Sequence, residues 1–343
     1  MAKAIRNIYN RSLTGPLLVC LFLALLPVGF PSNYILSILI IVAFYTIVGT
    51  GLTLLMGYAG QISLGHAAFY GIGSYTSAIL SAHAGLSPWL AMLAGMVLSA
   101  LVAFIVGIPT LKLKEHYLAL ATLGFGVIVF VFFKELDGLT GGLNGFFGIP
   151  SISLFGFPFD NDFRFYYLIW TLAMLGIIFA RNVVQSRVGR ALQAVKDSET
   201  AANSLGVPAQ KYKLQIFVLS AVYASVAGSL YAHYVSFINP ELFNVKTSLD
   251  FLIMVVIGGS GMVWGGVIGA AVFVILGEIL KEILPYFTDA SGEFQIVLFG
   301  VLLVVILIYM PRGLGPMVVQ TAKNRLRFGK RKAAAASGGD RSA

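Results

Sequence analysis

Apolar stretches of roughly twenty residues recur along the chain and constrain its fold more than any other feature. Ten apolar runs, some of them shorter, lie at 12–30, 34–56, 66–80, 88–108, 117–133, 164–180, 214–236, 250–258, 267–284 and 294–310. A helix of that length crosses a bilayer and satisfies its own backbone polar groups, as lipid requires. Only 11% of the 343 residues are charged, whereas a soluble domain carries charge on about 25%. We therefore predict an all-α polytopic membrane protein with about ten transmembrane helices.

Charge predicts how these crossings are oriented. Most of the 23 Lys and Arg residues, and few of the 14 acidic ones, fall in 1–11, 109–116, 181–213 and 311–343. Ten crossings put all four segments on one side, and positively charged loops stay in the cytoplasm. We expect both termini inside, because eight or nine crossings would misplace a basic segment. The net charge of +9 then suits anionic membrane lipid, and no nucleic acid partner is expected.

The two ends of the chain differ in composition. Residues 1–30 resemble a signal peptide, but no small-residue cleavage pattern follows, so we expect an uncleaved first helix. Cys20 lies within it and, as the single cysteine, excludes an intramolecular disulfide. We expect one transmembrane domain over 1–315 and a basic, disordered cytoplasmic tail over 316–343. The eighth run is short, and we expect its helix to extend into the glycines that follow.

The stretch "GYAGQISLGHAAFYGIGSY" (57–75) places polar residues and glycines among apolar neighbours. One interpretation is close helix packing through small residues, and the other is a discontinuous helix that lines a watery path. Gln61, Ser63 and His66 are costly against lipid, and they spread too widely around a helix for one thin seam. We favour a substrate path formed by these residues and Gly65. No metal site is expected, because His66 has no partner at ligand spacing.

Two further segments break the apolar pattern. "HYLALATLGFG" (116–126) contributes Tyr117 and Thr122 as candidate path residues, although Thr122 alternatively bonds back to its own helix. "GGSGMVWGG" (258–266) looks like the start of the earlier glycine stretch. Internal duplication is one explanation, and chance similarity between glycine-rich segments is the other.

The two large loops differ in character. The external loop 134–163 is rich in Gly, Phe and Pro, and the internal loop 181–213 is basic and helix-prone. In the internal loop we expect two short helices, the second capped by Asp197 or Ser198 and ended by Gly206. Such helices suit docking in a groove of another protein. An amphipathic helix resting on the bilayer is the alternative, but its apolar face would lack Trp and Phe.

Five stretches together resemble the permease subunits of bacterial branched-chain amino acid ABC transporters, of the LivM type. They are "GYAGQISLGHAAFYGIGSY", "HYLALATLGFG", "TGGLNGF", "GRALQAVKDSETAANSLGV" and "VIGGSGMVWGGVIGA", in family order. The resemblance implies a fold similar to the ten-helix (type II-like) importers of the bacterial inner membrane. The implied partners are a second related permease subunit, two cytoplasmic ATP-binding subunits and an extracytoplasmic solute-binding protein.

The resemblance also implies roles for individual residues. The internal loop is similar to the family's ATPase coupling motif, at Gly189, Arg190, Ala194, Asp197, Glu199, Ala201, Ala202 and Gly206. The "TGGLNGF" segment is expected to contact the binding protein through Gly141, Gly142, Asn144 and Gly145.

The function expected from these features is solute transport. The sequence contains no G-x-x-x-x-G-K-[ST] pattern, so ATP would bind the partner subunits, and the chain is expected to be no enzyme and to need no cofactor. An apolar path with a few polar groups suits a branched-chain or other neutral amino acid, with urea or a short amide as the alternative. A stand-alone secondary transporter or channel would need ionisable residues in the membrane. A membrane-embedded enzyme would need clustered His or carboxylates, whereas the four histidines are scattered.

Overall fold

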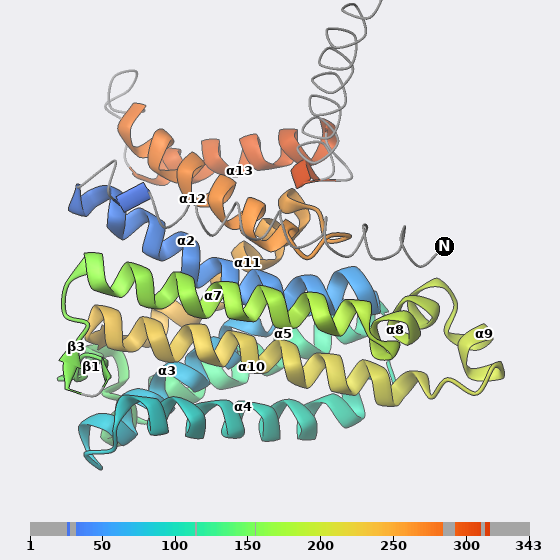
Figure 1. Ribbon diagram of the computed structural model, residues 1–343, viewed down its shortest axis with the longest axis horizontal. Helices are drawn as coiled ribbons and strands as arrows, with labels where there is room; N and C mark the ends of the chain where they lie inside the picture. The colour runs from blue at the N-terminus through green and yellow to red at the C-terminus, as the bar shows by residue number, and fades with distance from the viewer. Residues whose placement is uncertain are drawn as a thin grey trace, which may run out of the picture.

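The computed structural model describes residues 26–27, 32–113, 115–154, 156–283, 292–309 and 313–315. These residues form a bundle of long helices that run side by side (Figure 1). The long helices are α2 (Asn33–Leu52), α3 (His66–Ala82), α4 (Pro88–Thr110), α5 (Glu115–Glu135), α7 (Asp162–Gln185), α10 (Ala209–Val235), α11 (Val245–Gly258), α12 (Gly265–Ile283) and α13 (Gly292–Tyr309).

Several of these helices can cross a membrane by length and composition. Within the described residues, five stretches qualify: Asn33–Tyr58, Pro88–Thr110, His116–Glu135, Asp162–Gln185 and Ala209–Val235. The chain is therefore a mostly helical, multi-pass membrane protein. The count of ten crossings with both termini inside stays a prediction, because the first crossing (12–30, apart from residues 26–27), Cys20 and the tail 316–343 lie outside the described residues.

Shorter elements gather at the two opposite ends of the bundle (Figure 1). One end carries α6 (Asp137–Thr140), η2 (Gly142–Asn144), β1 (Phe146–Phe147), β2 (Ser153–Leu154), β3 (Phe157–Pro158), β4 (Phe237–Ile238) and η3 (Pro240–Phe243). There β1 pairs with β4 and β2 with β3, both antiparallel. The other end carries α8 (Arg187–Asp197) and α9 (Glu199–Ser204). The loops predicted as external and internal therefore lie on opposite sides of the bundle.

Glycines allow helices α3 and α10 to pack with their backbones in direct contact. A Cβ on Gly73 of α3 would lie 2.2 Å from the Ser225 carbonyl oxygen of α10, and one on Gly228 would lie 1.9 Å from the Tyr70 carbonyl oxygen. No larger residue fits either place without moving a helix. Since lipid offers no hydrophobic drive for helix association, such close packing holds the bundle together.

The eighth apolar run was expected to extend as a helix into the glycines that follow it, and this prediction is wrong. Helix α11 begins at Val245, upstream of the apolar run, and ends at Gly258. Gly259 has a φ of +93°, which favours glycine and stops the helix. Residues 259–264 then turn into α12.

Candidate functional site

The polar glycine segment forms a break between two helices of the bundle. Helix α2 continues into a π-helical turn, η1 (Thr53–Tyr58), residues 60–65 follow without helix, and α3 starts at His66. Gly60 has a φ of +67°, a conformation that suits glycine. The helix is therefore interrupted here, and the close packing of the other interpretation also occurs, since a Cβ on Gly65 or Gly71 would lie 2.5 or 2.6 Å from an atom of α5. The unpaired amides and carbonyls of the break need partners from elsewhere in the fold.

Hydrogen bonds tie the end of the break to two central helices. His66 Nδ1 lies 3.0 Å from Ser63 Oγ, and His66 Nε2 lies 2.6 Å from Ser220 Oγ on α10. The backbone amide of Ala67 donates to Ser248 Oγ on α11 over 3.0 Å. All of these groups are buried. The polar side-chain atoms of Ser63 and His66 thus bond to each other and to Ser220 of α10. The described residues contain no cluster of metal ligands.

Thr122 joins the break to α5. The Leu64 amide donates to Thr122 Oγ1 over 3.0 Å, and that hydroxyl donates to the Ala119 carbonyl of its own helix, also over 3.0 Å. A Cβ on Gly65 would lie 2.5 Å from the Thr122 carbonyl oxygen. Thr122 therefore bonds back to its own helix and also bridges two segments. Tyr117, five residues earlier on α5, is 62% exposed.

The two helices predicted in the internal loop are confirmed. Leu192 and Val195 of α8 are buried, and Val188 packs partly buried against the core. Ser198 caps α9, because its hydroxyl accepts from the Ala201 amide over 3.3 Å. The capping residue is thus Ser198 of the two candidates.

Lys196 connects α8 directly to the break. Its Nζ donates to the Gly57 carbonyl in the π-helical turn over 2.7 Å. Its Cγ lies 3.2 Å from the position of a Cβ on Gly60. On its other side Gly57 packs against the turn after α11, where a Cβ would lie 1.8 Å from the Ser260 carbonyl oxygen. Gly57 therefore contacts both α8 and the second glycine cluster.

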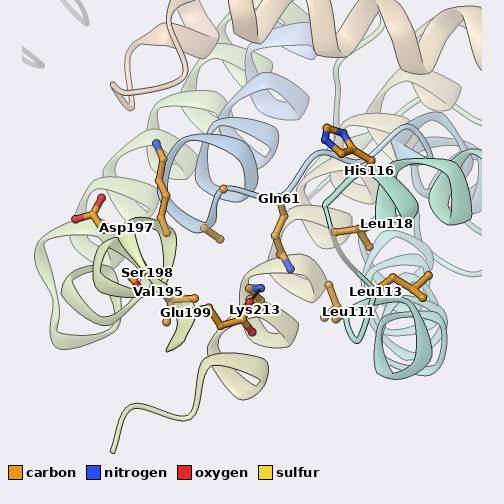
Figure 2. A pocket seen from close by; sticks show the side chains of 13 residues that line it. Gln61, Leu111, Leu113, His116, Leu118, Val195, Asp197, Ser198, Glu199 and Lys213 are labelled. Carbon is orange, nitrogen blue, oxygen red and sulfur yellow. Dashed lines mark hydrogen bonds and ion pairs between the residues drawn. The ribbon is translucent and has the colours of Figure 1, made fainter. Parts of the chain in front are cut away.

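A cavity of about 410 Å³ lies between the break, the start of α5 and the junction of α8 and α9 (Figure 2). Gln61 is 3% exposed, and no described group donates to its Oε1. Figure 2 shows its side chain in the middle of the lining, between Lys213 and Leu118. The remaining lining residues are Ala59, Gly60, Leu111, Leu113, His116, Val195, Lys196, Asp197, Ser198 and Glu199.

The opposite end of the bundle holds the glycine loop predicted to contact a binding protein. Gly141, Gly142 and Gly145 have φ values of +76°, +51° and +81°, so the loop depends on glycine. The Thr140 hydroxyl donates to the Phe133 carbonyl over 2.6 Å and accepts from the Gly142 amide over 3.2 Å. The loop is therefore held firmly on the end of α5.

Comparison with known proteins identifies the family. The model of the family described as "Branched-chain amino acid transport system / permease component" matches residues 34–307. The chain belongs to this permease family. It is 34% identical to the high-affinity branched-chain amino acid transport system permease protein LivM of Salmonella typhimurium, over 80% of this chain and 68% of that protein. It is 25% identical to LivH of the same organism, over 79% and 90%.

A solved structure is also similar to this permease. It is PsaBC from Streptococcus pneumoniae in complex with Fab, with 15% identity and a TM-score of 0.40 over 83% of this chain and 94% of that chain.

The permease separates the predicted path residues into three groups. Gln61 lines the cavity, Tyr117 is exposed on α5, and the others are buried in helix contacts. The buried group is Ser63, Gly65, His66 and Thr122. The structure does not bring all six around one space.

The predicted coupling residues of the permease divide by exposure. Gly189 and Ala202 are buried, and a Cβ on Gly189 would lie 2.0 Å from the Val184 carbonyl oxygen, so glycine permits the tight turn from α7. Gly206 ends the α9 segment with a φ of +81°. The exposed group is Arg190, Ala194, Asp197, Glu199, Ala201 and Gly206.

Sequence reasoning missed several residues that organise this site in the permease. Lys196 lies in a basic loop, and nothing in the pattern separates it from Lys211 or Lys213. Ser220 had a signal, since it interrupts an otherwise apolar helix, and it bonds to His66.

Proposed function

We propose that this chain is one permease subunit of an ATP-driven importer for branched-chain or other neutral amino acids in the bacterial inner membrane. The observation that carries the proposal is the bond between Lys196 of α8 and Gly57 at the broken helix, over 2.7 Å. This bond links α8, which is expected to contact an ATP-binding subunit, to the broken helix, which is expected to form the substrate path. Relatives named as branched-chain amino acid permeases support the substrate class.

The α8–α9 surface is the proposed docking site for a cytoplasmic ATP-binding subunit. Leu205, 84% exposed, projects where α9 ends. Its amide donates to the carbonyl of exposed Ala201, and Ala194 on α8 is a second small exposed position. A protruding apolar residue among small ones fits a groove on a partner. ATP would bind and be hydrolysed on the partners, so this chain acts as a transport subunit and needs no cofactor of its own.

The opposite end is the proposed landing surface for an extracytoplasmic solute-binding protein. Leu139 and Leu143 are 47% and 60% exposed there. Strand β1 pairs with β4, which places the loop before α7 beside the loop after α10. Exposed apolar side chains on a glycine-shaped, well-anchored loop are typical of a protein contact. A second, related permease subunit would complete the assembly.

Coupling follows from the bonds around the break. Closure of two ATP-binding subunits would move α8, and Lys196 would carry that movement to Gly57. From there the bonds of Leu64 to Thr122 and of His66 to Ser220 reach α5 and α10. The break would thus shift together with the central helices, which alternates access to the path.

Uptake by the complete transporter tests the proposal. The chain is co-expressed with a second permease, ATP-binding subunits and a binding protein encoded beside it, in cells that lack their own leucine uptake. We expect ATP-dependent accumulation of radiolabelled leucine that competes with isoleucine and valine. Accumulation of urea or acetamide in place of leucine would assign the alternative substrate class. Leucine uptake by this chain alone would contradict the coupled importer.

A further inference from the structure

The cavity beside α8 and α9 carries the chemistry of an amino acid site at the coupling end of the bundle. Its volume of about 410 Å³ lies in the range of small-molecule sites, about 300–1,000 Å³. It is formed by the break, the turn from α4 into the start of α5, the α8–α9 junction, and Lys213 of α10. Any occupant would contact the broken helix together with α8 and α9, the helices proposed to dock on the ATP-binding subunit.

The charges of the described residues that line the cavity balance. Lys196 and Lys213 are cationic, and Asp197 and Glu199 are anionic. Lys213 Nζ donates to Glu199 Oε2, so one ion pair closes part of the wall. Such a lining disfavours a ligand of strong single charge, such as a nucleotide, and favours one with a cation and an anion close together.

Gln61 supplies the second observation. It is 3% exposed, and its Oε1 has no donor among the described residues. A buried acceptor without a partner costs free energy, so an occupant that brings an N–H group is favoured there. Leu111 and Leu118 lie across from it and offer an apolar wall (Figure 2). An ammonium beside Gln61 and Glu199, a carboxylate beside Lys213, and an apolar side chain against the leucines would satisfy all of these features.

We propose that this cavity binds a free, zwitterionic amino acid with an apolar side chain at the coupling end of the permease. The choice of ligand rests on the proposed transport function. The site is separate from the buried Ser63 and His66 contacts. A bound amino acid would lie between α8 and the break. An amino acid released into the cytoplasm would thus bind beside α8 and α9, the helices proposed to dock on the ATP-binding subunit.

Protection from thiol labelling tests the site in the assembled transporter. His116 lines the cavity and is exposed, and Cys20 is the single native cysteine of the chain. A Cys20→Ser, His116→Cys chain is labelled with a maleimide in open membrane fragments that contain the whole complex, without ATP or binding protein. We expect L-leucine to slow labelling saturably. We expect no protection by 4-methylpentanoate, which lacks the ammonium, or by 3-methylbutylamine, which lacks the carboxylate.

Two variants in the same background make the test specific. Gln61→Leu should raise the half-protecting leucine concentration about tenfold, as expected for the loss of a hydrogen bond to a charged group. Gln215→Leu on α10, exposed and outside both the lining and the α8–α9 surface, should leave it unchanged. Equal labelling with and without leucine, or equal protection in Gln61→Leu, would overturn the proposal. Labelling blocked by assembly alone would overturn it too, because an ATP-binding subunit would then fill the cavity.

This experiment separates the site from the transport function. Leucine uptake by the complex without protection at position 116 would reject the cavity and keep the importer. Protection without leucine uptake would keep the cavity and reject the substrate proposed for transport.

Discussion

The ammonium of Lys196 lies 2.7 Å from the carbonyl oxygen of Gly57, 139 residues earlier in the chain. We expect Lys196→Met to lower the initial rate of leucine uptake about tenfold, because a hydrogen bond with a charged donor contributes about 1.5–3 kcal/mol. ATP-binding subunits should still co-purify, since α8 keeps its exposed face. Lys196→Arg, which retains a charged donor, should lose less. Unchanged uptake by the Met variant would remove this bond from the coupling route.

Gly57 has no room for a side chain. We expect Gly57→Ala to lower the thermal stability of the purified permease, because the added methyl would lie 1.8 Å from the Ser260 carbonyl oxygen and overpacking costs about 1–3 kcal/mol. Gly124→Ala is the matched control, since a Cβ there meets nothing within 4 Å. Equal melting temperatures for the two variants would contradict the close contact.

Leu205 should dominate the docking of the ATP-binding subunits. We expect Leu205→Asp to abolish their co-purification, because a charge would have to enter an apolar groove on the partner. Leu205→Ala should weaken association by more than about 1 kcal/mol. The membrane yield of the chain should not change, since Leu205 is 84% exposed and makes few contacts within the subunit. An intact complex with the Asp variant would move the docking surface elsewhere.

Leu143 offers the reciprocal experiment at the opposite end. We expect Leu143→Asp to weaken association with the solute-binding protein about tenfold, as loss of one well-packed interface anchor does. The ATP-binding subunits should co-purify as before. The affinity of the solute-binding protein for the reconstituted complex is the quantity to measure. An unchanged affinity in the Leu143→Asp variant would exclude this loop from the landing surface.

Orientation can be measured directly. In a Cys20→Ser background, we expect Arg190→Cys to react with a membrane-impermeant maleimide only after cells are opened, since α8 is predicted to be cytoplasmic. Asn144→Cys should react in intact cells. Both positions are exposed at opposite ends of the bundle. Labelling of Arg190→Cys from outside would reverse the predicted topology.

Sequence alone predicted the helices well because their causes are local. Apolar runs and capping residues such as Ser198 fix where an element begins, and both can be read from neighbouring positions. The direction in which α11 extends depended on the φ of Gly259, and the composition of a glycine cluster does not specify that angle.

The individual site residues were harder to predict because their partners are distant in sequence. Gln61 and His66 look equivalent in the pattern, yet Ser220 satisfies His66 while Gln61 lines a cavity. Which of the two has a partner depends on α10, more than 150 residues away. The role of Lys196 could likewise not be predicted from the sequence, because only the folded chain brings it to Gly57.

The pairing of β1 with β4 joins Phe147 to Phe237, whose rings lie 4.4 Å apart, across two loops that come from different parts of the chain. A partner that binds one of these loops would therefore also meet the other, because the pairing makes them one surface carried by α5, α7 and α10. Epitope tags inserted in either loop would therefore disturb the pair, and a tag for this subunit is better placed away from that ladder.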